Sequence, residues 1–312
     1  MSWISVALIA YLLLAVANLF DKFLVDNILK NSKAYAFIAC VMGMIVFAVS
    51  PWFLEWPGWS LFIFNILVGA VFAIALWLLY EALRRGEASR ILVFIGGITP
   101  VFSIILSLIF FKEHYALNQW LGIFLLFLGV IVIALLPQSR SYLSRIFNKL
   151  KISQASQTGG LWIALLCALA YAIYFVGTKY AYIEQPFLSA FIWNRLGAGL
   201  FVLLFLIDKT DREAIIKNFK KSGPKKNKFL VVINQVIGSG GFMLQSYAIF
   251  LGSVALVNAL QGVQYAFLLV ISAVLAVMAP KLLKENFSLR IVVQKTLAVL
   301  LIAAGLYFLT IF

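Results

Sequence analysis

The sequence is poor in charged residues, cysteine and histidine. Only 12% of its 312 residues are charged, and it holds two cysteines and one histidine. Both cysteines lie inside apolar segments, without a spacing that suits a metal site or a disulfide framework. The one histidine, His114, lies in a short connection between apolar segments. We therefore expect neither a histidine-based metal centre nor a histidine-assisted nucleophile. These absences argue against hydrolytic enzymes, and we predict a protein that is not an enzyme and has no cofactor or metal.

Apolar residues are present in excess. They make up 64% of the chain, and the mean hydropathy is +1.05, more than a water-soluble surface tolerates. Stretches of about 20 apolar residues, the length that crosses a hydrocarbon core of about 30 Å, recur almost end to end. The predicted segments are 3–21, 34–53, 60–83, 89–111, 117–136, 159–180, 187–207, 229–251, 254–279 and 290–312. We therefore expect an all-α membrane protein with ten transmembrane helices.

The basic residues follow the odd-numbered segments. The richest run lies between Lys209 and Lys228, whereas the even-numbered connections contribute only Lys112 and Lys179. By the positive-inside rule the odd-numbered connections face the cytoplasm, which puts both termini outside. The composition favours a bacterial plasma membrane. We interpret the run 209–228 as a solvated loop that fixes orientation, in preference to lipid-head-group or nucleic-acid recognition, and expect no nucleic-acid partner.

Short motifs recur in the same order in both halves of the chain. The matching pairs are residues 36–38 and Gly43 with 190–192 and Gly197, Lys22 with Lys179, Tyr80 with Tyr247, and Lys112-Glu113 with Lys284-Glu285. They predict a duplicated five-helix unit, residues 1–136 and 159–312, joined by a basic linker at 137–158. Because five is odd, the second copy enters the membrane from the opposite side, which makes an inverted repeat.

A longer series of motifs runs from the third to the fifth segment. It comprises Tyr80-Glu81-Ala82-Leu83, Ala88-Ser89, Pro100, Lys112-Glu113, Gln119-Trp120-Leu121-Gly122 and Gly129-Val130. This series resembles the signature of the EamA-type, ten-helix members of the drug/metabolite transporter superfamily. The second half keeps Tyr247-Ala248, Glu285 and Gly305 but has Ala266 in place of the aligned proline. The resemblance implies a transporter with two five-helix repeats. Many such proteins are described with cytoplasmic termini, whereas the charge bias here predicts the reverse.

Arg195 lies near the middle of the seventh segment, where a charge that faces lipid is costly. Its guanidinium does not deprotonate, so it needs a carboxylate, backbone carbonyls or an anionic ligand. Two interpretations stay open at this point. Arg195 either contacts a carboxylate or phosphate of a substrate, or it braces the fold through carbonyl groups or Glu81.

Segments eight and nine carry amide side chains at helical spacing. One face of segment eight carries Asn234, Gly238, Gly241 and Gln245. One face of segment nine carries Asn258, Gln261 and Tyr265. Uncharged amides both donate and accept hydrogen bonds, which suits the recognition of polar solutes. The alternative is interhelical hydrogen bonding, with the glycines permitting close packing.

Further candidate binding residues lie in the other segments. They are Asn18, Asn65, Trp77, Tyr80, Glu81 and Asn194. Glu81 could also carry a proton if it were desolvated beside Arg195 or Tyr80. Small multidrug exporters of the same superfamily rely on a deeply embedded glutamate in the first helix. The first segment here has no acidic residue in its depth, which disfavours proton-coupled export of lipophilic cations.

These observations favour a secondary-active or facilitative transporter that exports small polar organic metabolites, such as amino acids, by alternating access. The expected pivots are Gly96-Gly97 with Pro100 and Gly238 with Gly240-Gly241. The expected partners are a small-molecule solute and the lipid bilayer. Transport could be coupled to protons or to exchange, and the protein could be a monomer or a homodimer; the sequence leaves both questions open. Two alternatives are kept: a translocase for a lipid-linked or phosphorylated carrier substrate, and a structural membrane subunit without transport activity.

Overall fold

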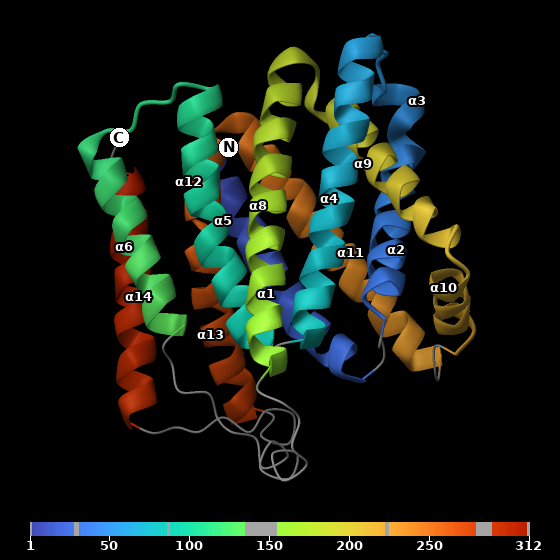
Figure 1. The fold of residues 1–312 in the computed structure, drawn as a ribbon. Helices are drawn as coiled ribbons and strands as arrows, with labels where there is room; N and C mark the ends of the chain where they lie inside the picture. Colours follow the sequence, from blue (N-terminus) through green and yellow to red (C-terminus); the bar gives the residue numbers. More distant parts are fainter. Residues whose placement is uncertain are drawn as a thin grey trace.

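The helices stand side by side in one bundle (Figure 1). The computed structural model describes residues 2–27, 31–85, 88–134, 155–221, 225–278 and 289–310, and all regular structure within these ranges is helical. Both ends of the chain lie at the same end of the bundle, together with the α3–α4, α5–α6 and α8–α9 connections (Figure 1). The all-α fold expected from the sequence is thus confirmed.

The first half of the chain forms three long helices, one composite segment and one shorter helix. Its elements are α1 (Trp3–Asn27), α2 (Ser32–Gly43), η1 (Met44–Val49), α3 (Ser50–Phe53), α4 (Trp59–Arg85), α5 (Ala88–Phe110) and α6 (Leu117–Ala134). The side chain of Asn31 begins α2 by accepting a hydrogen bond of 3.0 Å from the backbone N–H of Ala34. Gly58 precedes α4 with φ of 84°, a conformation that favours glycine. The predicted second segment is therefore built from α2, η1 and α3 in succession.

The second half contains one broken helix and one helix that the sequence did not predict. Its elements are α8 (Ala155–Glu184), α9 (Phe187–Leu203), η2 (Leu204–Leu206), α10 (Lys209–Lys221), α11 (Lys225–Leu251), α12 (Val254–Ala259), α13 (Gln261–Met278) and α14 (Leu289–Thr310). The predicted ninth segment is interrupted at Leu260, where α12 ends and α13 has not yet begun.

Helix α10 corrects the interpretation of residues 209–228 as a solvated loop. The side chain of Asp208 accepts hydrogen bonds from the backbone N–H groups of Thr210, at 2.8 Å, and Asp211, at 3.1 Å, so it caps the first turn. Ile215 on the same helix is buried. A capped start and a buried apolar side chain explain why the first part of this basic run is helical.

Within the described ranges, five helical segments are long and apolar enough to cross a membrane. They are Trp3–Phe20, Ser32–Phe53, Trp59–Arg85, Gly160–Glu184 and Phe187–Leu206. Shorter apolar helices cover Phe94–Phe110, Leu117–Val132, Val254–Leu268 and Thr296–Phe308. These segments make a multi-pass membrane protein, while the count of ten spans and the internal repeat stay predictions.

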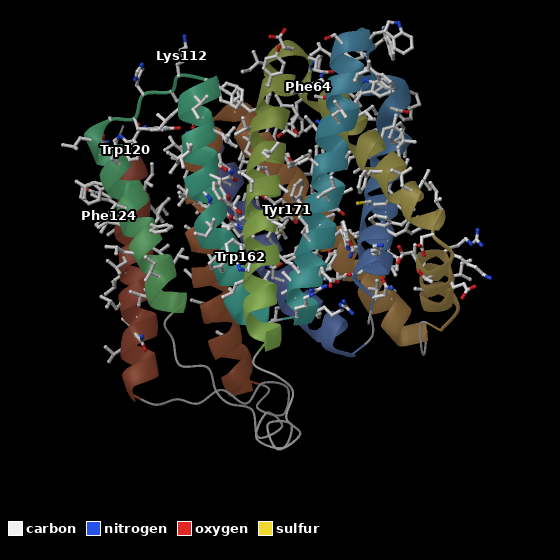
Figure 2. The ribbon with its side chains drawn as sticks, viewed as in Figure 1. Phe64, Lys112, Trp120, Phe124, Trp162 and Tyr171 are labelled. Carbon is white, nitrogen blue, oxygen red and sulfur yellow. The ribbon has the colours of Figure 1, made fainter. Side chains whose placement is uncertain are left out.

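The outer surface of the bundle is apolar. Trp120 and Phe124 on α6 point away from the other helices (Figure 2), and Trp162 on α8 is exposed as well. Exposed aromatic rings of this size suit contact with lipid. Trp52 and Trp59, on either side of the α3–α4 connection, are also exposed, as expected for an aromatic belt at a membrane interface.

Glycines allow the central helices to approach closely. A Cβ atom on Gly69 of α4 would lie 2.0 Å from the carbonyl oxygen of Asn194 on α9, and one on Gly197 would lie 2.3 Å from that of Ile66. The crossing of α4 and α9 therefore requires glycine at both positions. Helices α6 and α14 approach in the same way, since a Cβ on Gly305 would lie 2.9 Å from the carbonyl oxygen of Gly122.

Candidate functional site

Arg195 is held inside the bundle by aromatic rings. Its side chain belongs to α9 and is 7% exposed. The guanidinium carbon lies 4.3 Å from the ring centroid of Phe72, 4.6 Å from that of Phe191 and 4.7 Å from that of Phe242. These rings come from α4, α9 and α11, and each attracts the cation through its π face. Three helices therefore converge on one buried positive charge.

No carboxylate neutralises this charge within the described part of the chain. Arg195 forms neither an ion pair nor a hydrogen bond with a residue of the described ranges. Glu81, proposed as its partner, instead pairs with Arg84 and Arg85, each at 2.7 Å, and accepts a hydrogen bond of 2.6 Å from Ser32. Among the described residues, Arg195 is therefore not braced by Glu81 or by carbonyl groups. Glu81 is satisfied by residues of its own end of α4 and of α2.

Two predicted asparagines lie buried on the helices that carry this charge and its nearest ring. Asn65 on α4 is 0% exposed, and Asn194 on α9 is 1% exposed. The side-chain nitrogen and oxygen of both residues have no hydrogen-bond partner among the described residues. Buried amides without partners are uncommon and cost free energy. Helices α4 and α9 thus carry two buried amides without partners among the described residues, in addition to the charge of Arg195 and its nearest ring.

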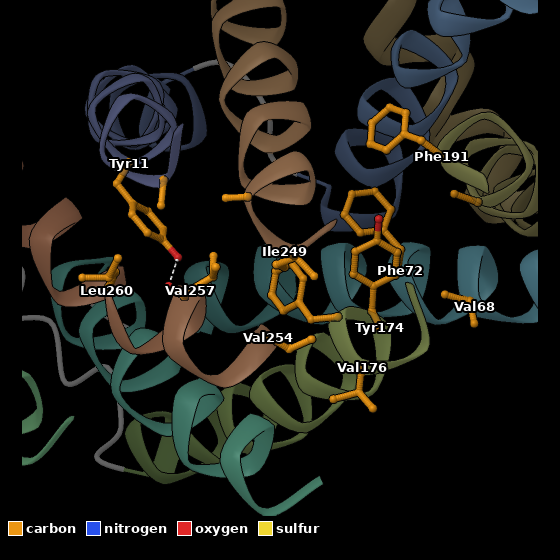
Figure 3. Close-up of a cluster of buried hydrophobic side chains, with 14 of the residues drawn as sticks. Tyr11, Val68, Phe72, Tyr174, Val176, Phe191, Ile249, Val254, Val257 and Leu260 are labelled. Carbon is orange, nitrogen blue, oxygen red and sulfur yellow. Dashed lines mark hydrogen bonds between the residues drawn. The ribbon is translucent and has the colours of Figure 1, made fainter. Parts of the chain in front are cut away.

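A tyrosine and a cysteine also lie in reach of the Arg195 charge. The ring of Tyr174 packs on that of Phe72, with centroids 4.9 Å apart, as the close-up of the core shows (Figure 3). Both Tyr174 and Cys40 interact electrostatically with Arg195. A Cβ atom on Gly43 of α2 would lie 3.9 Å from Nη1 of Arg195. The guanidinium is thus close to α2 and α8 as well as to the three helices that supply its rings.

A chain of buried polar side chains crosses the bundle beside the break at Leu260. Asn258 on α12 donates a 2.8 Å hydrogen bond to Oγ of Ser103 on α5. Gln245 on α11 contacts Oδ1 of Asn258 at 3.5 Å and the hydroxyl of Tyr11 at 3.4 Å. Tyr11 on α1 in turn donates a 2.6 Å hydrogen bond to the carbonyl oxygen of Val257 (Figure 3). These contacts join α1, α5, α11 and α12.

The glycine face of α11 packs against α1. A Cβ on Gly241 would lie 3.0 Å from Leu14 and 3.2 Å from the carbonyl oxygen of Ala10, and one on Gly238 would lie 3.5 Å from Ala17. Asn234 is buried on the same helix. The glycines of this face therefore pack against α1, and Gln245 makes interhelical contacts with Tyr11 and Asn258, while solute recognition by these amides stays a prediction.

Two more predicted residues lie with Glu81 toward the last turns of α4. The ring of Tyr80 is 4.2 Å from that of Tyr35. Trp77 lies 5.8 Å from the ring of Phe205 and 5.5 Å from Nζ of Lys33. Lys33 itself pairs with Asp211, which fastens α10 to α2. The structure therefore gathers Trp77, Tyr80 and Glu81 at one end of the bundle and away from the charge of Arg195.

The remaining predicted binding residues are Asn18, Gln261 and Tyr265. Asn18 is half-buried on α1. Gln261 begins α13, and its Oε1 atom is buried with no hydrogen-bond partner in the ranges described. Tyr265 belongs to α13, but its side chain lies outside the described residues.

A second polar cluster ties helices together at the end of the bundle that carries the chain termini. Nζ of Lys179 on α8 donates hydrogen bonds to the carbonyl oxygens of Ile249 at 3.0 Å, Phe250 at 3.1 Å and Gly252 at 2.7 Å. A cation at a helix C-terminus is favourable because carbonyl groups end unpaired there. The sequence marked Lys179 as a repeat position and as one of two basic residues in the even-numbered connections, but one lysine near the end of an apolar segment does not predict these contacts.

Glu113 belongs to the same cluster. Its Oε2 atom accepts a hydrogen bond of 2.5 Å from Ser253, whose side chain begins α12, and another from the hydroxyl of Tyr115. Burial and the neighbouring Glu113 carboxylate raise the pKa of Tyr115, which keeps this hydroxyl protonated as a donor. Lys179 and Glu113 together connect α8 and the α5–α6 connection to the junction of α11 and α12.

Comparison with known proteins identifies the first half of the chain. Residues 1–135 match the EamA-like transporter family. A relative from Bacillus subtilis (strain 168), the uncharacterized transporter YdfC, is 30% identical over 152 residues, which are 47% of this chain and 42% of YdfC. The uncharacterized protein MJ1333.1 of Methanocaldococcus jannaschii is 36% identical over 72 residues, 23% of this chain and 52% of that protein. The matched regions thus span about half the length of these relatives.

A solved structure extends the likeness of fold over the rest of the chain. A crystal structure described only as that of a protein superposes with a TM-score of 0.62 at 14% sequence identity and covers 98% of this chain and 96% of its own. At this identity the match shows a shared fold alone. The chain is thus similar to the EamA-like transporter family over residues 1–135 and shares the fold of this solved structure over nearly all of its length.

Proposed function

We propose that the protein carries small polar organic solutes with an anionic group outward across a plasma membrane, and that Arg195 binds the anionic group. A buried guanidinium without a counter-ion is strongly disfavoured, because aromatic faces compensate only part of its lost hydration. An anionic solute would supply the missing partner. The isolated charge of Arg195 is the observation that carries this proposal.

The mechanism that we propose is alternating access between two inverted five-helix halves, residues 1–136 and 159–312. The packing of the helices supports it. Helix α1 packs on α11, α8 packs on α4, and α6 packs on α14. If a pseudo-two-fold axis relates the two halves, the α1–α11 pair corresponds to the α8–α4 pair. Arg195, Phe72 and Phe191 are buried and Phe242 is partly buried, as a closed intermediate of such a cycle requires.

The test is a comparison of metabolites inside cells and in the medium by mass spectrometry. Cells contain the wild type, Arg195→Gln, Trp162→Ala or an empty vector, at matched amounts of protein in the membrane. We expect one class of anionic solutes to change with the wild type and with Trp162→Ala, whose side chain faces outward, and not with Arg195→Gln. An unchanged profile with the wild type, or full activity of Arg195→Gln, would contradict the proposal.

The proposed orientation, with both termini outside, has its own test. Reporter proteins that are active only in the cytoplasm are fused after Phe312 and within residues 222–224. The excess of lysine and arginine in the odd-numbered connections predicts activity from the second fusion alone. Activity at Phe312 with none at 222–224 would reverse the orientation.

A further inference from the structure

The centre of the bundle carries a positive charge without a negative one. Among the described residues, Arg195 and Glu81 are the charged side chains that are buried, and Glu81 is neutralised by Arg84 and Arg85. The sequence has eleven acidic residues, and none of them falls in the middle of a helix long enough to span the membrane. Counting the described residues alone, the surroundings of Arg195 therefore have a net charge of +1.

We infer that this site selects solutes with a net charge of −1, namely carboxylates that bear a hydroxyl or oxo group and no ammonium group, over zwitterionic amino acids. The inference rests on the proposed function, and it narrows the class of solute. A monoanion neutralises Arg195 and leaves no charge unpaired. A zwitterion would bring an ammonium group that has no carboxylate to meet it.

Aromatic rings are the usual alternative partners for an ammonium group, and the three rings nearest Arg195 already face its guanidinium. The faces of Phe72, Phe191 and Phe242 already lie within 4.7 Å of the guanidinium. A second cation against the same rings would be repelled by Arg195 at short range. An ammonium group would thus lose its hydration without gaining an equivalent partner. Burying an ion without a counter-charge in this way costs free energy.

The buried amides on α4 and α9, the helices that carry Phe72 and Arg195, suit uncharged polar groups. Asn65 and Asn194 each present a donor and an acceptor that have no partner among the described residues. A hydroxyl or oxo oxygen on the carbon next to the carboxylate accepts from an amide N–H, and a hydroxyl also donates to an amide oxygen. Such a ligand would satisfy the charge and an amide together, which matches a hydroxy acid or an oxo acid.

Gly43 offers a way to reverse the charge balance. A Cβ atom at this position would lie 3.7 Å from Cδ and 3.9 Å from Nη1 of Arg195, which is ordinary contact distance. The substitution Gly43→Asp would therefore place a carboxylate beside the guanidinium and neutralise it. Gly43→Asn has almost the same shape without the charge and is the matched control.

The experiment measures uptake into liposomes that contain the purified protein, with pairs of solutes that differ in a hydroxyl against an ammonium group. The pairs are lactate with alanine and 3-phenyllactate with phenylalanine, and a set of other carboxylates and phosphates is tested alongside. For the wild type we expect the hydroxy acid of at least one pair to be transported about tenfold faster than the amino acid, or more. Gly43→Asp should reduce this ratio at least about tenfold, whereas Gly43→Asn should keep it.

Three results would overturn the inference. Equal or faster transport of the amino acids contradicts the selection of monoanions but leaves the proposed transport function intact. A hydroxy-acid preference that Gly43→Asp and Gly43→Asn change alike shows that the charge of Arg195 does not set it. Transport of none of the solutes by correctly folded protein contradicts the proposed function and, with it, this inference.

Discussion

The side-chain amide of Asn258 donates a 2.8 Å hydrogen bond to Oγ of Ser103 and so joins α12 to α5 beside the break at Leu260. Both side chains are fully buried, so water does not replace a lost partner. We expect Asn258→Leu to lower the free energy of unfolding by about 1–3 kcal/mol, because Ser103 and Gln245 both lose a contact. Thermal unfolding of the purified protein in detergent measures the change.

A double-mutant cycle provides the control for Asn258. Ser103→Ala removes the acceptor, and the effects of the two substitutions should be less than additive by at least about 0.5 kcal/mol if the hydrogen bond couples them. Strict additivity would mean that this bond contributes nothing to the stability of the bundle.

Gly69 should not tolerate alanine. Its missing Cβ leaves room for the carbonyl oxygen of Asn194, only 2.0 Å from where a methyl group would stand, so Gly69→Ala forces α4 and α9 apart. We expect a loss of stability of about 1–3 kcal/mol or more, together with reduced transport. Gly240 is the matched control, because no atom lies within 4 Å of its Cβ position. Gly240→Ala should leave the melting temperature unchanged or raise it, since alanine is the better helix former. Equal destabilisation by both changes would contradict this account of the crossing.

Lys179 should stabilise the junction of α11 and α12. The change Lys179→Met removes three hydrogen bonds to carbonyl oxygens while it keeps most of the side-chain volume. We expect amide hydrogen exchange in residues 249–256 to become about tenfold faster, which corresponds to about 1.4 kcal/mol. The exposed Lys112 is the control, and Lys112→Met should leave these amides unaffected. Unchanged exchange in Lys179→Met would show that the lysine is not needed to hold the junction.

The cap of α10 should depend on pH. Hydrogen bonds from the hydroxyl and the backbone of Thr210 and from the backbone of Asp211 lower the pKa of Asp208 below its ordinary value. A carboxylate with a depressed pKa stabilises the folded helix above its ordinary pKa, and the contribution is lost as the pH falls through the depressed value. Asp208→Ala should therefore speed exchange of the Thr210 and Asp211 amides at pH 7, and the difference from wild type should vanish in acid.

Asp208→Asn is the control for the role of charge. An asparagine also caps helices, so exchange in this variant should stay slow and should not change across the titration of Asp208. Fast exchange in Asp208→Asn at neutral pH would assign the protection to the charge alone.

The sequence predicted the features that follow from local composition. A membrane interior excludes unpaired backbone groups and most charges, so apolar runs such as 60–83 and 187–207 had to be helices, and α4 and α9 lie where those runs do. The same rule singled out Arg195, because a charge in the middle of such a run is costly wherever it points. It also marked Gln245 and Asn258, whose amides form part of the buried polar chain.

What surrounds each of these residues was decided by packing between distant segments. The sequence could not tell that Arg195 would meet Phe72 and Phe242, because phenylalanines in apolar runs are too common to mark a site. The sequence also could not show whether the side chains of Glu81 and Arg195 meet, since their distance depends on how α4 and α9 cross. The crossing itself follows from glycines that matter only when both helices are present. Local apolarity therefore determined which segments span the membrane, whereas the close approach of helices remote in sequence decided which polar groups meet and which charge stays unpaired.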